Sequence, residues 1–334
     1  MGNDSKRKKE FERNKNLEIF LEEVNNDLWN SEKELLKNEF PELPLLFIVG
    51  PHRSGTTLVL QWLANTNEFA YPTNLLSRFY KAPIVGAKIQ RLLTDEKYNY
   101  RNEILDFDSK INYESENGKT KGAVAPNEFW YFWRRFLPFG DLDYLPSLEL
   151  KKKVNIELLK KELYGIANVF EKPFALKALI MNYNIDFLDT IFENALFIYT
   201  KRDPLTNIES ALEARIRQYG DVEKWYSFKI PEYNELIKMK DPILQTAGQI
   251  YYINKAVKKG LEKVKEDKKI IFQYEDFCDN PEKYYYEIRR KLMGKGHILS
   301  KDYKGPSSFR ITRSNAKDQR IEDAYNYFLQ KYGE

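Results

Sequence analysis

Residues 50–57 have the residue types of an anion-binding loop. They read Gly-Pro-His-Arg-Ser-Gly-Thr-Thr, with four residues between the two glycines and two hydroxyl residues at the end. Backbone N–H groups in such a loop, followed by the N-terminus of a helix, bind phosphate oxygens, and the glycines permit the turn. Thr56 stands where the phosphate loop of nucleoside-triphosphate enzymes has its lysine, so the fixed cation of this loop is Arg53. The alternative is a glycine turn that binds no ligand.

A second cationic motif follows a later apolar run. Residues 199–204 read Tyr-Thr-Lys-Arg-Asp-Pro, and Ser210 comes shortly after them. Arg202 lies just past the carboxyl end of a predicted strand, where open α/β sheets bind their ligands. Ser210 lies two turns into the helix predicted next, so both side chains can reach one phosphate from different sides. The alternative is that Arg202 and Asp203 form a surface ion pair that caps this helix.

Short apolar runs bounded by turn residues indicate the strands that must position these motifs. We expect strands at residues 45–49, 174–176, 195–200 and 270–274. We expect helices at residues 56–65, 185–192, 205–217 and 281–292. Alternating strands and helices are typical of βαβ units, so an α/β fold with a parallel sheet covered on both faces is predicted.

The whole chain, residues 1–334, is expected to form one domain. Within residues 1–40 apolar side chains recur at helical spacing, so an amphipathic helix should pack on the main body. Residues 81–171 are rich in aromatic side chains and have no strand signal, so we expect a helical insertion there.

The composition excludes several classes of protein. Lys and Arg number 54 against 50 Asp and Glu, a net charge of +4 that does not suggest a nucleic-acid partner. One cysteine, Cys278, excludes a disulfide framework, and with only two histidines, His52 and His297, no metal site is expected. No apolar run reaches about eighteen residues, so we expect no membrane span. Low cysteine usage without an export signal predicts a cytoplasmic protein, and the oligomeric state is open.

Together these motifs resemble those of sulfotransferases that use 3′-phosphoadenosine 5′-phosphosulfate, in the carbohydrate and bacterial branch. The matching segments are residues 47–60 (the 5′-phosphosulfate loop), 174–177 (a strand ending in lysine), 197–211 (the 3′-phosphate motif) and 274–281 (the segment after a late strand). The resemblance does not extend to residues 81–171.

The resemblance implies a three-layer α/β/α fold with a central parallel sheet, related to that of P-loop nucleotide kinases, with a sulfuryl donor in place of ATP and no metal. Arg53 would neutralise the leaving phosphate bridge, Lys177 would stabilise the transferred group, and Arg202 with Ser210 would bind the 3′-phosphate. The other residues assigned to the nucleotide are His52, Ser54, Gly55, Thr56 and Thr57 in the loop, Tyr274 after the last strand, and Arg313 in a basic stretch near the C-terminus.

The chain departs from the family where a catalytic base is expected. Cytosolic members have a histidine base, for which this chain offers no candidate, and other branches have a glutamate after the loop, where only Glu68 is near. We assign the base to Glu128, because a carboxylate among the aromatic residues 129–133 would be desolvated, which favours proton uptake from an alcohol. The alternative is that Glu128 pairs with Arg134 or Arg135 on a structural helix.

The sequence thus predicts an enzyme that moves a sulfuryl group in line from the nucleotide donor to a hydroxyl group. The acceptor, which would bind on the side of residues 81–171, is a small alcohol, a lipid or a carbohydrate. Two alternatives stay open. A kinase with an aberrant loop is disfavoured by the missing lysine, and a catalytically silent nucleotide-binding scaffold is disfavoured by the presence of both Arg53 and Arg202.

Overall fold

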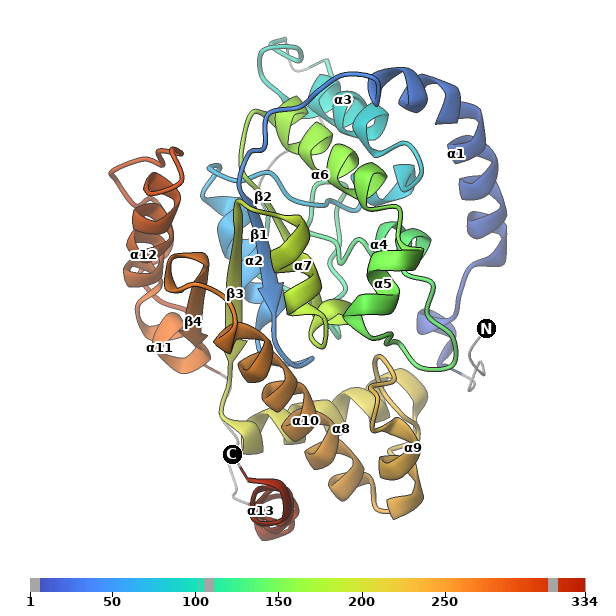
Figure 1. Ribbon diagram of the computed structural model, residues 1–334, viewed down its shortest axis with the longest axis vertical. Coiled ribbons are helices and arrows are strands. Elements are labelled where there is room, and N and C mark those ends of the chain that lie inside the picture. The colour runs from blue at the N-terminus through green and yellow to red at the C-terminus, as the bar shows by residue number, and fades with distance from the viewer. Residues whose placement is uncertain (1–6, 102, 105–110, 312–317, 334) are drawn as a thin grey trace.

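A computed structural model describes residues 7–101, 103–104, 111–311 and 318–333. At its centre lies a sheet of four parallel strands in the order β2-β1-β3-β4 (Figure 1). The strands are β1 (Leu45–Val49), β2 (Phe174–Lys177), β3 (Ala195–Lys201) and β4 (Lys269–Gln273). Val49 pairs with Tyr199, and Lys201 pairs with Gln273, so the carboxyl ends of neighbouring strands lie along one edge.

The two faces of the sheet bury alternate side chains of each strand. Leu45, Phe47 and Val49 lie in the larger of two hydrophobic cores, whereas Leu46 and Ile48 lie in the smaller one. This alternation follows from the two-residue period of a strand. All of β1 is buried, so the sheet is the middle layer of a three-layer α/β/α fold.

Helices cover both faces of this sheet (Figure 1). The smaller core receives side chains from α2 (Thr56–Asn65), α11 (Tyr274–Asp279) and α12 (Pro281–Met293). The larger core receives side chains from α6 (Ile156–Phe170), α7 (Ile185–Ile191) and α10 (Pro242–Glu262), and both α8 (Pro204–Tyr219) and α13 (Gln319–Tyr332) pack against α10. The other helices are α1 (Lys15–Leu35), α3 (Pro83–Thr94), α4 (Trp130–Phe136), α5 (Ser147–Lys153) and α9 (Tyr233–Leu236).

Three of these helices begin in the same way. Asp203, Asp241 and Asn280 each cap a helix by accepting a hydrogen bond from a backbone N–H of the first turn, and each is followed by proline. The cap satisfies an N–H group that has no partner within the helix, and proline suits the first helical position. The start of α8, which carries Ser210, is therefore fixed directly after Arg202.

The strands and the helices between them agree with the sequence. All four predicted strands are present, and α2 has the predicted bounds. Helices α10 and α13 were not predicted. Within residues 81–171, α6 is part of the larger core, with Leu159 and Leu163 fully buried, so this segment supports the sheet as well as flanking it. No helix of the described residues is both long enough and apolar enough to cross a membrane.

Candidate active site

Four strand ends bring the predicted site residues to one edge of the sheet. Gly50 follows β1, Lys177 is the last residue of β2, Arg202 follows β3 and Tyr274 follows β4. Since all four strands are parallel, their carboxyl ends meet at the same edge, where open α/β sheets bind ligands. Segments far apart in the sequence thus form one candidate site.

The anion-binding loop turns sharply between β1 and α2, and both of its glycines are required. Gly50 and Gly55 have φ angles of 134° and 93°. A Cβ atom at Gly50 would lie 2.6 Å from the carbonyl oxygen of Thr200, and one at Gly55 would lie 2.2 Å from the ring of Tyr274. Asn182 holds the first glycine from both sides, because its amide donates to the Gly50 carbonyl (2.8 Å) and its oxygen accepts from the Gly50 N–H (2.9 Å).

The hydroxyl residues of the loop have different roles, because one bonds within the loop and the others begin helix α2. Ser54 Oγ donates to the carbonyl oxygen of Pro51 (2.7 Å) and lies 3.2 Å from Thr200 Oγ1, so this side chain holds the loop closed. Thr56 is buried in the first turn of α2, whereas Thr57 Oγ1 faces Lys177. The first N–H groups of α2 have no acceptor within the helix, and its N-terminus carries partial positive charge, so an anion is favoured here.

Two arginines from different motifs meet at the loop. Arg53 has a left-handed backbone (φ 65°), and its Nε donates to Ser210 Oγ on α8 at 3.3 Å. Arg202 Nη1 donates to the carbonyl oxygen of Arg53 at 2.9 Å. The Arg202 guanidinium also lies 4.9 Å from the ring centroid of Tyr274. The structure therefore brings four of the predicted nucleotide-binding residues together.

The electrostatic surroundings of Arg53 favour a bound anion. Burial lowers the pKa of Arg53, the phenol of Tyr226 opposes this change, and the positive charges of Arg217 and Arg202 lower the pKa further. A guanidinium that has lost hydration and lies near other cations is stabilised by an anion. A phosphate or sulfonate group at the loop would supply that charge.

Lys177 links the loop to the predicted base. Its Nζ lies 3.0 Å from Thr57 Oγ1 and 2.5 Å from Glu128 Oε1, and its side chain is only 5% exposed. The Glu128 side chain is 45% exposed, and its second oxygen, Oε2, bonds to none of the described residues. One carboxylate oxygen is thus held by Lys177, and the other has no partner among the described residues.

The aromatic neighbours of Glu128 do not desolvate its carboxylate, contrary to the reason for which it was predicted as the base. The aromatic side chains that follow it, Phe129, Phe132 and Trp133, are buried in the larger core and leave the carboxylate partly exposed rather than desolvated. The alternative pairing is also absent, since Arg134 pairs with Asp143 and Arg135 with Glu162. Its contact with Lys177 is what places Glu128 at the site.

A turn from the same segment covers this lysine–glutamate pair. Asn117 and Gly118, with φ angles of 50° and 84°, form the turn between the mutually hydrogen-bonded residues Glu116 and Lys119. A Cβ atom at Gly118 would lie 3.3 Å from Glu128 Oε1. On the other side, Arg217 Nε of α8 donates to Asn117 Oδ1 at 3.0 Å. Residues 81–171 therefore contribute both Glu128 and this turn to the site.

His52 is a buried residue of the anion-binding loop. Its ring packs against Tyr226 and Phe228, with centroids 5.3 and 6.3 Å away, and its carbonyl oxygen accepts a hydrogen bond from Asn207. Both ring nitrogens are enclosed and have no partner within the described chain. Burial first, and then the charges of Arg215 and Arg53, lower the pKa of His52 to about 3, so the ring is neutral.

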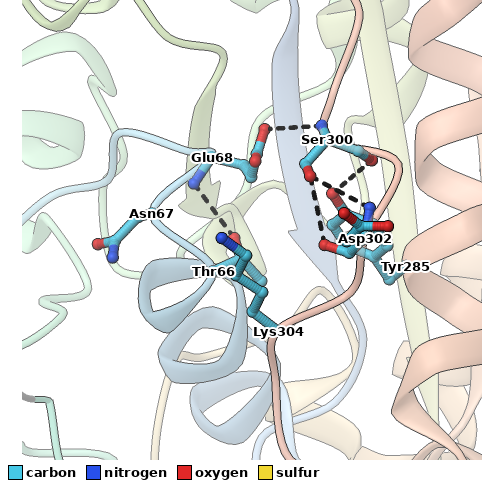
Figure 2. A pocket seen from close by; sticks show the side chains of 7 residues that line it. All are labelled: Thr66, Asn67, Glu68, Tyr285, Ser300, Asp302 and Lys304. Atoms are coloured by element: carbon cyan, nitrogen blue, oxygen red, sulfur yellow. Dashed lines mark hydrogen bonds between the residues drawn. The ribbon is translucent and has the colours of Figure 1, made fainter.

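Glu68 lies at the far end of α2 from the loop. This helix has 10 residues and is about 15 Å long, and Ala70, just beyond it, pairs with Phe174 at the start of β2. Figure 2 shows Glu68 in a polar pocket of about 210 Å³, where its Oε2 accepts a hydrogen bond from the N–H of Ser300 at 3.3 Å. This pocket lies away from the carboxyl edge, so Glu68 is not placed to act on a ligand at the loop.

Three further features concern the C-terminal stretch, the loop and metal binding. Arg313 lies outside the described residues. Asn182 and the turn at 117–118 were not predicted, although an Asn-Gly pair is a recognised signal for a tight hairpin turn. Among the residues that the structure describes, no group of three or more His, Cys, Asp or Glu side chains could hold a metal ion.

The fold and the site define an α/β protein with an anion-binding loop and a lysine–glutamate pair at the carboxyl edge of a parallel sheet. Residues 44–292 match the model described as "Sulfotransferase family", and the chain belongs to this family. The structure is similar to the crystal structure of sulfotransferase STF9 from Mycobacterium avium, with a TM-score of 0.51 and 16% identity over 93% of this chain and 73% of that one.

Two further comparisons were less informative. Sulfotransferase STF1 from Mycobacterium tuberculosis H37Rv has a TM-score of 0.49 and 14% identity, over 93% of this chain and 78% of that one. No curated protein matches the chain. At such identities the similarity to the first structure shows the fold alone.

Proposed function

We propose that this protein transfers a sulfuryl group from 3′-phosphoadenosine 5′-phosphosulfate to a hydroxyl acceptor. The main support is the convergence of Arg53, Arg202 and Ser210 on one loop, through hydrogen bonds of 3.3 and 2.9 Å. Two fixed guanidinium groups beside a helix N-terminus suit a ligand with two separate anionic groups. The nucleotide donor carries such groups on the 5′ and 3′ positions of its ribose.

We assign the 5′-phosphosulfate to the anion-binding loop, where the N–H groups of Ser54 and Gly55 and the hydroxyls of Thr56 and Thr57 would bind the 5′-phosphate. The 3′-phosphate is assigned to Arg202 and Ser210, with Arg313 as a further candidate and the Tyr274 ring beside Arg202. Ser210 Oγ now accepts from Arg53 Nε. Binding of the 3′-phosphate would replace that bond and release the Arg53 guanidinium for the phosphosulfate.

Transfer would proceed by in-line displacement at sulfur. The S–O bond to the phosphate breaks as a new S–O bond to the acceptor oxygen forms, and the acceptor's hydroxyl proton passes to Glu128 Oε2. Arg53 stabilises the charge that grows on the leaving phosphate oxygen. A lysine ammonium has three N–H donors, and Lys177 uses two of them on Thr57 and Glu128, so the third is available to the sulfonate.

The acceptor would approach from the side of residues 81–171, which supply Glu128 and the turn at 117–118. We propose a hydroxyl of a small molecule, a lipid or a glycan as the acceptor, with no metal and no nucleic acid. The whole chain would act as one domain. One cysteine in the sequence suits a reducing compartment, so we propose that the enzyme works in the cytoplasm.

The proposal is tested by supplying a donor with a radioactive sulfur label and a panel of sugars, phenols and lipid alcohols. We expect labelled product and release of adenosine 3′,5′-bisphosphate from the wild type. Glu68→Gln, which changes a carboxylate outside the site, should be as active as the wild type. Phosphoryl transfer from ATP with magnesium would show a kinase instead. Nucleotide binding without transfer to any acceptor or to water would show a silent scaffold.

A further inference from the structure

Tyr226 is a polar residue at the site for which the transfer step above has no role. It lies in the loop between α8 and α9 and is only 8% exposed. Its ring meets that of His52 edge-on, with centroids 5.3 Å apart and an angle of 68° between the planes. Since His52 directly precedes Arg53, the phenol is seated against the anion-binding loop.

Helix α10 fixes the backbone around Tyr226. Gln249 Nε2 donates to the carbonyl oxygens of Tyr226 (3.1 Å) and Phe228 (3.3 Å), and the Phe228 ring also packs on His52. The Tyr226 ring is therefore held in place before any ligand binds. A group held in position in advance loses little conformational freedom on binding.

The hydroxyl of Tyr226 has no partner among the described residues, although the ring is buried. It makes no hydrogen bond within the described part of the chain, and it is not sealed from solvent as the ring nitrogens of His52 are. Tyrosine hydroxyls in protein interiors usually have a partner, so an unpartnered hydroxyl on a fixed ring is available to a ligand. Burial raises the pKa of Tyr226 to about 12, so the phenol keeps its proton and can donate a hydrogen bond.

The charges that act on Tyr226 belong to groups on both sides of the proposed transfer. After burial, the largest influences on Tyr226 come from Arg53, on the loop, and Glu128, the proposed base. In turn, Tyr226 exerts the largest single charge effect on Arg53. Together with the ring contact to His52, which directly precedes Arg53, these influences are consistent with a phenol beside the arginine of the loop.

We infer that Tyr226 binds the sulfonate group of the nucleotide donor and so contacts the transferred group directly. This inference rests on the proposed function. The Tyr226 hydroxyl donates to a non-bridging sulfonate oxygen and keeps its proton throughout, while the S–O bond to the phosphate breaks and the acceptor's proton goes to Glu128. Tyr226 would thereby orient the sulfur for in-line attack.

A merely structural role for Tyr226, bracing His52, leads to a different expectation. Tyr226→Phe keeps the ring and its packing on His52 and removes only the hydroxyl. If the ring alone matters, this variant should bind every nucleotide as the wild type does. If the hydroxyl binds the sulfonate, only ligands that carry a sulfonate should be affected.

Calorimetric titrations of wild type and Tyr226→Phe, without acceptor, separate these roles. The two ligands are the phosphosulfate donor and adenosine 3′,5′-bisphosphate, which lacks the sulfonate. We expect the variant to bind the donor at least about tenfold more weakly, as for loss of a hydrogen bond to a charged group. Its bisphosphate affinity should stay within about twofold of the wild type. Tyr285→Phe is the matched control, because its hydroxyl bonds the Ser300 carbonyl in the pocket of Figure 2, and neither affinity should change.

Each result decides the question. Unchanged donor affinity in Tyr226→Phe overturns the inference and leaves the proposed function standing, and so does an equal loss for both ligands. If the wild type binds neither ligand, the proposed function fails and the inference fails with it.

Discussion

Replacing Glu128 by glutamine separates proton transfer from structural support. The amide is close to the carboxylate in size but cannot act as a base at neutral pH. In the structure Oε1 lies 2.5 Å from Lys177 Nζ, and Oε2 bonds to none of the described residues. The substitution therefore removes one ion pair and the proposed base, while the amide oxygen can still accept a hydrogen bond from Lys177.

The two expected effects differ greatly in size. Lys177 is buried, but the Glu128 side chain is 45% exposed and the amide oxygen can still accept a hydrogen bond from Lys177. Loss of the ion pair should therefore lower the free energy of unfolding by only about 1 kcal/mol. For a chain of 334 residues that shifts the melting temperature by only about 1–2 °C. Loss of a general base should lower turnover by about a hundred- to ten-thousandfold.

Three measurements on Glu128→Gln check this reasoning. Turnover is followed by release of adenosine 3′,5′-bisphosphate, nucleotide affinity by calorimetry, and stability by denaturant unfolding, with Glu68→Gln as the control. We expect turnover to fall while affinity and stability stay near those of the wild type. Turnover at about a tenth of the wild-type value or better would refute the assignment. An equal fall in turnover and in donor affinity would show that Glu128 acts by binding.

Three other substitutions test separate parts of the site. Arg202→Ala should lower the affinity for adenosine 3′,5′-bisphosphate by about ten- to a hundredfold in calorimetry, because a charge-assisted contact is lost. The affinity for adenosine 5′-monophosphate should not change. Arg53→Ala should lower turnover far more than bisphosphate affinity, since the bridge charge develops mainly in the transition state. His52→Phe should make the free energy of unfolding depend less on pH in the acidic range than it does in the wild type. The native pKa of His52 is about 3, against about 6.5 when unfolded, so stability falls as the pH falls through this window, by up to about 1.4 kcal/mol per pH unit.

The outcomes that contradict these predictions are distinct. An equal loss of affinity for both nucleotides in Arg202→Ala would mean that the 3′-phosphate binds elsewhere. An equal loss of turnover and of bisphosphate affinity in Arg53→Ala would mean that Arg53 only binds the nucleotide. For His52→Phe, denaturant unfolding between about pH 6.5 and 4 should show a shallower decline than in the wild type. An identical decline in both proteins would mean that His52 takes up its proton in the native state.

The sheet could be predicted because its strands are short, continuous apolar runs. Burial on both faces leaves no room for polar residues in β1 or in most of β3, and that pattern is visible without a structure. Helix α10 was missed although Asp241 and Pro242 mark its start. Its buried side includes polar residues that bond to neighbouring segments, among them Gln245 and Gln249, so the apolar period is interrupted.

Site residues could be predicted where they directly follow a predicted strand. Arg202 was predicted from that rule, whereas Lys177 was assigned through the family resemblance, and the chain direction of a parallel sheet explains why both lie at one edge. Asn182 and Tyr226 join the site only through tertiary contacts and have no local pattern. Glu128 was chosen for its aromatic neighbours, but those side chains belong to the core, and the contact with Lys177 could not be read from the sequence.

The most direct test of the central claim compares nucleotide affinities of the wild-type protein by calorimetry. The ligands are adenosine 3′,5′-bisphosphate, adenosine 5′-monophosphate, and ATP with magnesium. We predict that the bisphosphate binds at least about tenfold more tightly than the monophosphate, because only the bisphosphate offers a 3′-phosphate to Arg202 and Ser210. Equal affinity for these two nucleotides, or tightest binding of ATP with magnesium, would contradict the assignment of this site to the phosphosulfate donor.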